Sequence, residues 1–137
     1  SLKMDNKNGI SANEYSKSIK KFLLKNIKLN PKSKILDSGC GRGKILGNLS
    51  SKLKCKQKPL GIDIIDHKDR DKRISFKKTS ASTFFLKNKK KFDLILIKQT
   101  IHLMNIKEIK RLLNSLKKNL NQNDKIFILN LNTNENE

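Results

Sequence analysis

Short apolar runs and amphipathic stretches alternate along most of the chain. Short apolar runs predict five strands, at 34–37, 60–64, 74–78, 92–98 and 125–130. The run at 74–78 is the weaker one, and the run at 92–98 is nearly continuous, as in a strand buried on both faces. Apolar positions that recur every three or four residues predict four helices, at 12–28, 44–54, 82–88 and 105–120. Strands that alternate with helices form right-handed βαβ units. The pattern therefore predicts an α/β fold, with a mostly parallel sheet of about five strands and helices on both faces.

The length and the order of these elements set the expected organisation. A chain of 137 residues is typical of one domain. We expect a single domain over 1–137, with an N-terminal helical segment at 1–30 and a core at 34–131. The apolar runs are too short to span a membrane, and the first residues lack the apolar run of a signal peptide. We therefore expect a cytoplasmic protein without a membrane span.

The charge raises the question of a nucleic-acid partner. Lys and Arg number 32 against 12 Asp and Glu, a net charge of +20. Only 4 of the 32 are arginine, whose planar guanidinium is the side chain best suited to phosphates and base edges. The chain also holds 16 Ile, 16 Asn and no Val, and Lys, Asn and Ile share A/T-rich codons. We favour a nucleotide-biased genome as the cause, and keep nucleic acid as the less favoured partner.

Metal and disulfide chemistry have little support in the sequence. The two cysteines, Cys40 and Cys55, are too few for a disulfide framework or for a zinc site with four Cys and His ligands. The segment 66–71 holds three aspartates and a histidine among basic residues, and we interpret these as solvated charge. We expect no metal.

The most informative segment is the turn after the first core strand. Asp37 stands at the strand end, and Gly39, Gly41 and Gly43 follow before the next helix. Glycines permit positive φ and let a ligand lie against the backbone, and a helix start adds N–H groups. A dinucleotide fingerprint would read G-x-G-x-x-G, so the third glycine comes one residue early here. A carboxylate at Asp37 would also repel a pyrophosphate and attract an ammonium or sulfonium group, which disfavours a dinucleotide oxidoreductase.

This turn resembles motif I of the class I S-adenosylmethionine-dependent methyltransferases, which reads acid-x-G-x-G-x-G. Two further resemblances follow in order: Gly61-Ile-Asp-Ile64 is similar to the second-strand motif of that family, and 92–102 is similar to its fourth-strand motif. The resemblance covers about 34–131. It implies a Rossmann-like fold with strand order 3-2-1-4-5, S-adenosylmethionine as cofactor, and methyl transfer to an acceptor.

The resemblance also implies a set of cofactor-binding residues. They are Asp37, Gly39, Cys40, Gly41, Gly43, Asp63, Ile64, Ser80 and Ala81. Asp37 would face the amino-acid end of the cofactor, Asp63 would hold the ribose hydroxyls, and Ile64 would lie against the adenine. Ser80 and Ala81 stand where the family often has an acid for the adenine amino group, and a serine hydroxyl can accept the same hydrogen bond.

Catalytic residues are harder to assign. Lys98, Gln99 and His102 follow the fourth strand, beside the transferable methyl group, and a general base there could reach the substrate. Tyr15 would either fold over the cofactor or only pack. The sequence lacks the Asn/Asp-Pro-Pro-aromatic motif of adenine-N6 methylating branches and the Pro-Cys dipeptide of the cytosine-C5 type. We expect a small-molecule acceptor.

Two further hypotheses remain open. The second function class is a basic nucleic-acid-binding module on a Rossmann-like scaffold, including an RNA methyltransferase fragment. The family sheet has seven strands and this chain supplies about five, so we expect a truncated reading of a longer protein, or another chain over the open edge. The fifth strand, at 125–130, would lie at that edge with four consecutive apolar residues. We therefore expect self-association through this strand.

Overall fold

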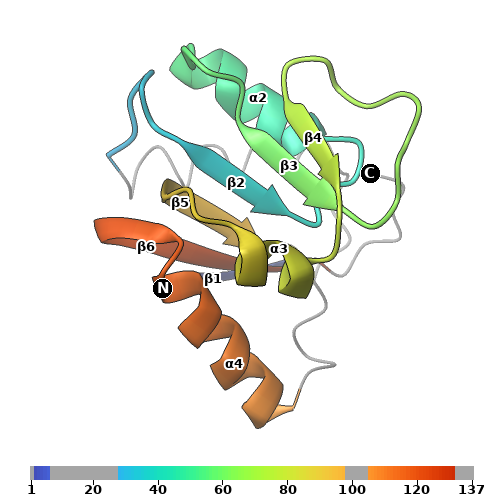
Figure 1. Ribbon diagram of the computed structural model, residues 1–137. Helices are drawn as coiled ribbons and strands as arrows, with labels where there is room; N and C mark the ends of the chain where they lie inside the picture. Colours follow the sequence, from blue (N-terminus) through green and yellow to red (C-terminus); the bar gives the residue numbers. More distant parts are fainter. Residues whose placement is uncertain (1, 7–27, 98–104, 132–137) are drawn as a thin grey trace.

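A six-stranded sheet runs through the computed structural model, which describes residues 2–6, 28–97 and 105–131 (Figure 1). The strands are β1 (Leu2–Asn6), β2 (Ile35–Ser38), β3 (Leu60–Asp63), β4 (Ser75–Lys78), β5 (Phe92–Ile97) and β6 (Leu120–Leu131). The helices of the described part are α2 (Lys44–Leu53), α3 (Ala81–Lys87) and α4 (Ile106–Lys117). The strand order is β1-β6-β5-β2-β3-β4, and each neighbouring pair is parallel.

The predicted α/β fold is confirmed. The five expected strands are β2 to β6, and they stand in the expected order 3-2-1-4-5. Their bounds agree with the prediction closely, except that β6 begins at Leu120 and not at 125. The helices expected at 44–54, 82–88 and 105–120 correspond to α2, α3 and α4. The helix expected at 12–28 lies outside the described residues.

Two apolar cores fix the helices to opposite faces of the sheet. The core under α2 contains the buried side chains Ile35, Ile45, Leu46, Leu49, Leu53, Leu94 and Leu96. The core under α3 and α4 contains Leu36, Ile62, Phe84, Phe85, Ile95, Ile97 and Leu116. Successive residues of a strand point to opposite faces, so β2 and β5 supply both cores. This explains why β5 reads as a continuous apolar run.

The sheet edge beside β6 differs from the prediction. β1 pairs with β6 in parallel, with Leu2 opposite Phe127 and Asn6 opposite Leu131. The expectation that the fifth strand forms an open edge is wrong, because the chain's own segment 2–6 occupies that edge. The expected self-association through this strand loses its basis. Part of the segment expected to be helical, 1–30, is therefore a strand.

The helices of the described part are short. α4, the longest of them, has 12 residues, and α2 has 10. No helix among the described residues is long and apolar enough to cross a membrane.

The carboxyl ends of the parallel strands define where a ligand site can form. β2, β3 and β4 end side by side, at Ser38, Asp63 and Lys78. β2 lies between β3 and β5, so the strand order changes direction there. In open α/β sheets, ligands bind outside the carboxyl ends at such a switch point. The glycine turn follows β2 at this place.

Candidate functional site

The turn from β2 to α2 depends on three glycines. The φ angle is 82° at Gly39, 56° at Gly41 and 83° at Gly43, a region that residues with a side chain rarely adopt. The amide of Gly39 donates to the carbonyl oxygen of Ile62 at 2.8 Å, which holds the turn against β3. The turn therefore presents backbone without side chains at the carboxyl edge of the sheet.

The carboxylate of Asp63 joins this turn to the end of β3. Its Oδ2 accepts a hydrogen bond from the Gly41 amide at 2.8 Å, and its Oδ1 accepts one from the Ile64 amide at 2.7 Å. The Ile65 amide lies 3.4 Å from the same Oδ1. A carboxylate has about four acceptor positions, so Asp63 retains room for a further donor. The second-strand acid thus holds the glycine turn against the end of β3.

Two residues at the turn are buried. Asp37 is completely buried at the end of β2, and Cys40 is 2% exposed. The Cys40 thiol points into the core, where a Cβ on Gly61 would come within 2.6 Å of its sulfur. Gly61 is therefore needed for close packing between β3 and the turn. The Cys40 sulfur also lies 3.6 Å from the Gly41 carbonyl oxygen and 3.8 Å from an Arg70 guanidinium nitrogen, so the side chain packs inside the turn.

The residues that follow β3 and β4 flank the same edge. Ile64 and Ile65 are 65% and 55% exposed, and they form an apolar surface next to Asp63. Ser80 is the N-cap of α3, because its hydroxyl oxygen accepts a hydrogen bond from the Thr83 amide at 3.2 Å. The same hydroxyl donates a hydrogen bond to the Thr83 Oγ1 at 2.9 Å. Ala81 is the first residue of that helix. The adenine contact expected of Ser80 and Ala81 stays a prediction.

Three ion pairs involve a loop over residues 64–74, here called the strap: the first joins it to the glycine turn, and the other two lie within the strap. They are Arg42–Asp69 at 2.9 Å, Arg70–Asp66 at 3.3 Å and Arg73–Asp71 at 2.6 Å. The interpretation of these aspartates as solvated charge is incomplete, because each has an arginine partner, although Asp66 and Asp69 remain largely exposed. The close spacing of arginine and aspartate in 66–73 is the sequence signal for these pairs.

Arg70 connects the strap to the glycine turn. Its side chain is 9% exposed. One of its guanidinium nitrogens donates to the Gly41 carbonyl oxygen, and the other donates to the Ile65 carbonyl oxygen at 3.1 Å. Its guanidinium carbon lies 3.3 Å from the ring centroid of Phe76, a cation–π contact. One side chain therefore fixes both Gly41 and the residues after Asp63.

Arg73 pairs with Asp71 inside the strap and anchors the strap to α2. Arg73 also donates to the Asn48 Oδ1 at 3.0 Å and to the Ser51 Oγ at 2.9 Å. The hydrogen bond from Arg73 holds the pKa of Asp71 below its usual range, and the same bond raises the pKa of Arg73. The strap packs closely here, since a Cβ on Gly47 would come within 2.6 Å of the Asp71 Oδ2.

The Arg42–Asp69 pair lowers the pKa of its aspartate in the same way, at the protein surface. Arg42 donates to the Asp69 carboxylate, and this hydrogen bond lowers the pKa of Asp69. The candidate catalytic residues Lys98, Gln99 and His102, and also Tyr15, lie outside the described residues.

The family of the chain follows from a comparison with family models. The model of a methyltransferase domain matches residues 10–136, nearly the whole chain. The chain therefore belongs to this methyltransferase domain family. A search of curated protein sequences gives no match.

Solved structures of methyltransferases share the fold. An S-adenosylmethionine-dependent methyltransferase from Archaeoglobus fulgidus is 21% identical, with a TM-score of 0.63 over 81% of this chain and 51% of its own. Plantazolicin methyltransferase BpumL, in complex with S-adenosylhomocysteine and a triazolic desmethylPZN analog, is 26% identical. The match has a TM-score of 0.59 and covers 83% of this chain and 44% of BpumL. Coclaurine N-methyltransferase, bound to N-methylheliamine and S-adenosylhomocysteine, is 15% identical. The match has a TM-score of 0.65 and covers 90% of this chain and 38% of the coclaurine enzyme. The fold is Rossmann-like, and the chain spans about half the length of these structures or less.

Proposed function

We propose that this chain binds S-adenosylmethionine and takes part in the transfer of its methyl group to an acceptor. The observation that carries the proposal is the hydrogen bond of 2.8 Å between the Asp63 carboxylate and the Gly41 amide. It joins a turn of three positive-φ glycines to an acid at the end of the next strand. Membership of the methyltransferase family supports the same reading.

The residues present suit an adenosine carrying a cationic amino-acid group. Gly39, Gly41 and Gly43 would let the ligand lie against the backbone. Asp63 keeps acceptor capacity for the ribose hydroxyls, and the exposed Ile64 offers apolar surface to the adenine.

The remaining predicted residues act from the edges of this site. Asp37 places a carboxylate beneath the turn, which attracts an ammonium group more strongly in a buried setting than it would in water. Cys40 keeps the shape of the turn. Ser80 and Ala81 would border the adenine at the start of α3.

Methyl transfer from a sulfonium donor depends more on the alignment of donor and acceptor than on a particular catalytic side chain. S-adenosylmethionine supplies an electrophilic methyl group on a sulfonium, and orientation of the two reactants can lower the barrier by up to about 7–11 kcal/mol. The residues described above would bind and orient the donor. Lys98, Gln99 or His102 would remove a proton from the acceptor where one must leave.

The class of methyl acceptor, the domain organisation and the cellular location stay proposals. The bound N-methylheliamine of one solved neighbour is a small molecule, which supports a small-molecule acceptor here. One sheet from β1 to β6 supports a single domain over 1–137. The cytoplasmic location and the nucleic-acid-binding alternative stay predictions.

Titration calorimetry with S-adenosylhomocysteine tests the proposal. We expect the wild-type chain to bind, and Gly41→Val to abolish binding, because a β-branched side chain opposes the φ of 56° and fills the turn. Thermal unfolding of the variant confirms that it is folded. Absence of binding to the wild-type chain, or normal binding to a folded Gly41→Val variant, would refute the proposal.

A further inference from the structure

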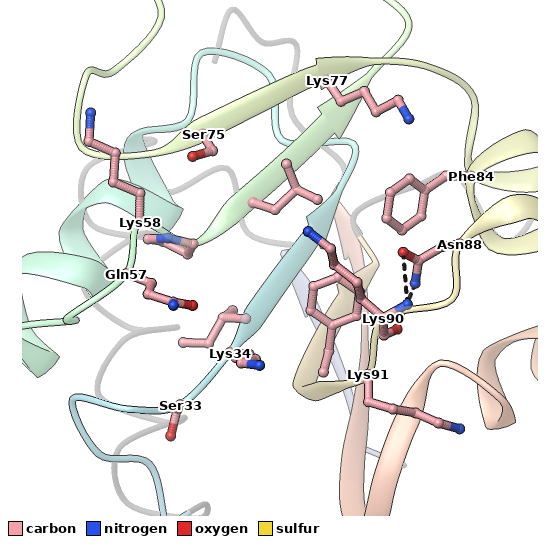
Figure 2. A pocket seen from close by; sticks show the side chains of 14 residues that line it. Ser33, Lys34, Gln57, Lys58, Ser75, Lys77, Phe84, Asn88, Lys90 and Lys91 are labelled. Carbon is pink, nitrogen blue, oxygen red and sulfur yellow. Dashed lines mark hydrogen bonds between the residues drawn. The ribbon is translucent and has the colours of Figure 1, made fainter.

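A cavity lies at the opposite end of the sheet from the glycine turn. It encloses about 580 Å³ and is lined at the starts of β2, β3, β4 and β5 by residues such as Ile35, Leu60, Ser75 and Phe92 (Figure 2). The carboxyl ends of the same strands carry Ser38 and Asp63. The cofactor site and this cavity therefore use opposite edges of one sheet.

Lysines dominate the polar part of this cavity. Five of its 14 lining residues are Lys34, Lys58, Lys77, Lys90 and Lys91, and none of the lining residues is acidic. All five are exposed. They come from four separate segments of the chain, and the fold brings them to one place: Lys58 on one side of the hollow and Lys77 on the other (Figure 2).

These charges are not neutralised by carboxylates in the described part of the chain, where none of the five lysines forms an ion pair. The Lys91 Nζ donates to the Lys118 carbonyl oxygen at 2.6 Å, and the Lys77 Nζ lies 6.0 Å from the ring centroid of Phe84. Asp93, which follows the lining residue Phe92, accepts from the backbone amide of Lys34 at 2.7 Å. Like charges gathered in this way repel one another, and a bound anion would relieve that repulsion.

The size and the apolar lining of the cavity favour a small organic anion over a nucleic acid strand. A volume of this size is typical of sites for small organic ligands. Its floor includes Ile35, Phe84 and Phe92, which are each at most 6% exposed. Binding of single-stranded nucleic acid relies on exposed aromatic rings on which bases stack, and these two rings are buried. Gln57 and Asn88 add amide groups at the rim for hydrogen bonds.

We propose that this cavity binds a small molecule that carries several phosphate groups, of about the size of a nucleoside triphosphate. The lysine ammonium groups would contact the phosphates as point charges, and the apolar floor would contact the organic part. The proposal is independent of the proposed methyl transfer, because no residue of the glycine turn or of Asp63 lines the cavity.

The test uses inorganic tripolyphosphate and ATP as probes, in calorimetry at about 0.15 M salt, where long-range attraction is screened. We expect both to bind the wild-type chain and to raise its melting temperature. The triple variant Lys58→Gln, Lys77→Gln, Lys90→Gln should lose affinity by about tenfold or more. The matched control is Lys72→Gln, Lys107→Gln, Lys110→Gln, which removes the same charge from exposed lysines outside the cavity. It should change affinity by less than about threefold.

Two results would overturn the proposal. Equal losses in the two triple variants would mean that the net charge of +20 attracts anions without a site. Binding of a single-stranded oligonucleotide through the same three lysines, with no binding of tripolyphosphate or ATP, would mean that the surface serves nucleic acid.

Discussion

The Asp63 carboxylate accepts a hydrogen bond of 2.8 Å from the amide of Gly41, which lies 22 residues earlier in the chain. This bond joins the glycine turn to the end of β3. The Arg70 guanidinium also links these two segments, since it donates to the carbonyl oxygens of Gly41 in the turn and of Ile65 after β3. The two arms of the candidate cofactor site are therefore coupled, and a change in either arm should disturb the other.

Replacement of Asp63 should weaken cofactor binding more than it weakens the fold. In Asp63→Asn the charge is lost and only one acceptor oxygen remains, and a hydrogen bond to a charged group contributes about 1.5–3 kcal/mol. We expect the affinity for S-adenosylhomocysteine, measured by calorimetry, to fall by more than about tenfold. Asp69→Asn is the matched control, because Asp69 pairs with Arg42 at the surface. A folded Asp63→Asn variant with unchanged affinity would contradict the assigned role.

Replacement of Arg70 should lower both stability and cofactor affinity. Arg70→Lys keeps the charge but loses the planar fork that reaches two carbonyl oxygens and stacks on Phe76. We expect a loss of about 1–3 kcal/mol in the free energy of unfolding, together with several-fold weaker binding of S-adenosylhomocysteine. Arg42→Lys, at a more exposed ion pair, should change both quantities little. Equal effects of the two changes would argue against a special role for Arg70.

Alanine at position 47 should destabilise the protein even though it sits in a helix. Alanine normally favours a helix interior over glycine by about 1 kcal/mol. At Gly47, however, the new Cβ would come within 2.6 Å of the Asp71 Oδ2 and 2.8 Å of an Arg73 nitrogen. We expect a lower melting temperature for Gly47→Ala. Gly47→Ala should lower the melting temperature less in an Asp71→Ala background than in the wild type. An equal loss in the two backgrounds would mean that contact with the Asp71 side chain is not the cause.

The Asp71–Arg73 pair should make stability depend on pH in the acid range. The folded-state pKa of Asp71 lies below the ordinary value of 3.8, so the pair stabilises the fold above that pH. The contribution is lost as the pH falls through the folded pKa. We expect the difference in melting temperature between the wild type and Asp71→Asn to be constant from about pH 7 to pH 5 and to shrink below pH 3.8. Because Arg73 is 41% exposed, the whole effect should stay below about 1 kcal/mol.

The glycine turn and most of the sheet could be predicted from the sequence because their causes are local. β5 is recognisable from a run of apolar residues that face two cores. Gly39, Gly41 and Gly43 are recognisable because their φ angles are ones that glycine adopts without strain. Such requirements act within a few residues, so the residue pattern alone determined them.

Contacts between distant segments were decided only by the tertiary structure. β1 has few apolar residues, and it is a strand because β6 supplies backbone partners more than a hundred residues away, which any sequence can use. Arg70 has its role because folding brings Gly41 and Phe76 to its guanidinium. The lysines around the cavity at the strand starts are ordinary members of a lysine-rich chain until the fold brings these strands together. In each case the residue interacts with a partner that is distant in the sequence, and that partner comes within reach only when the chain has folded.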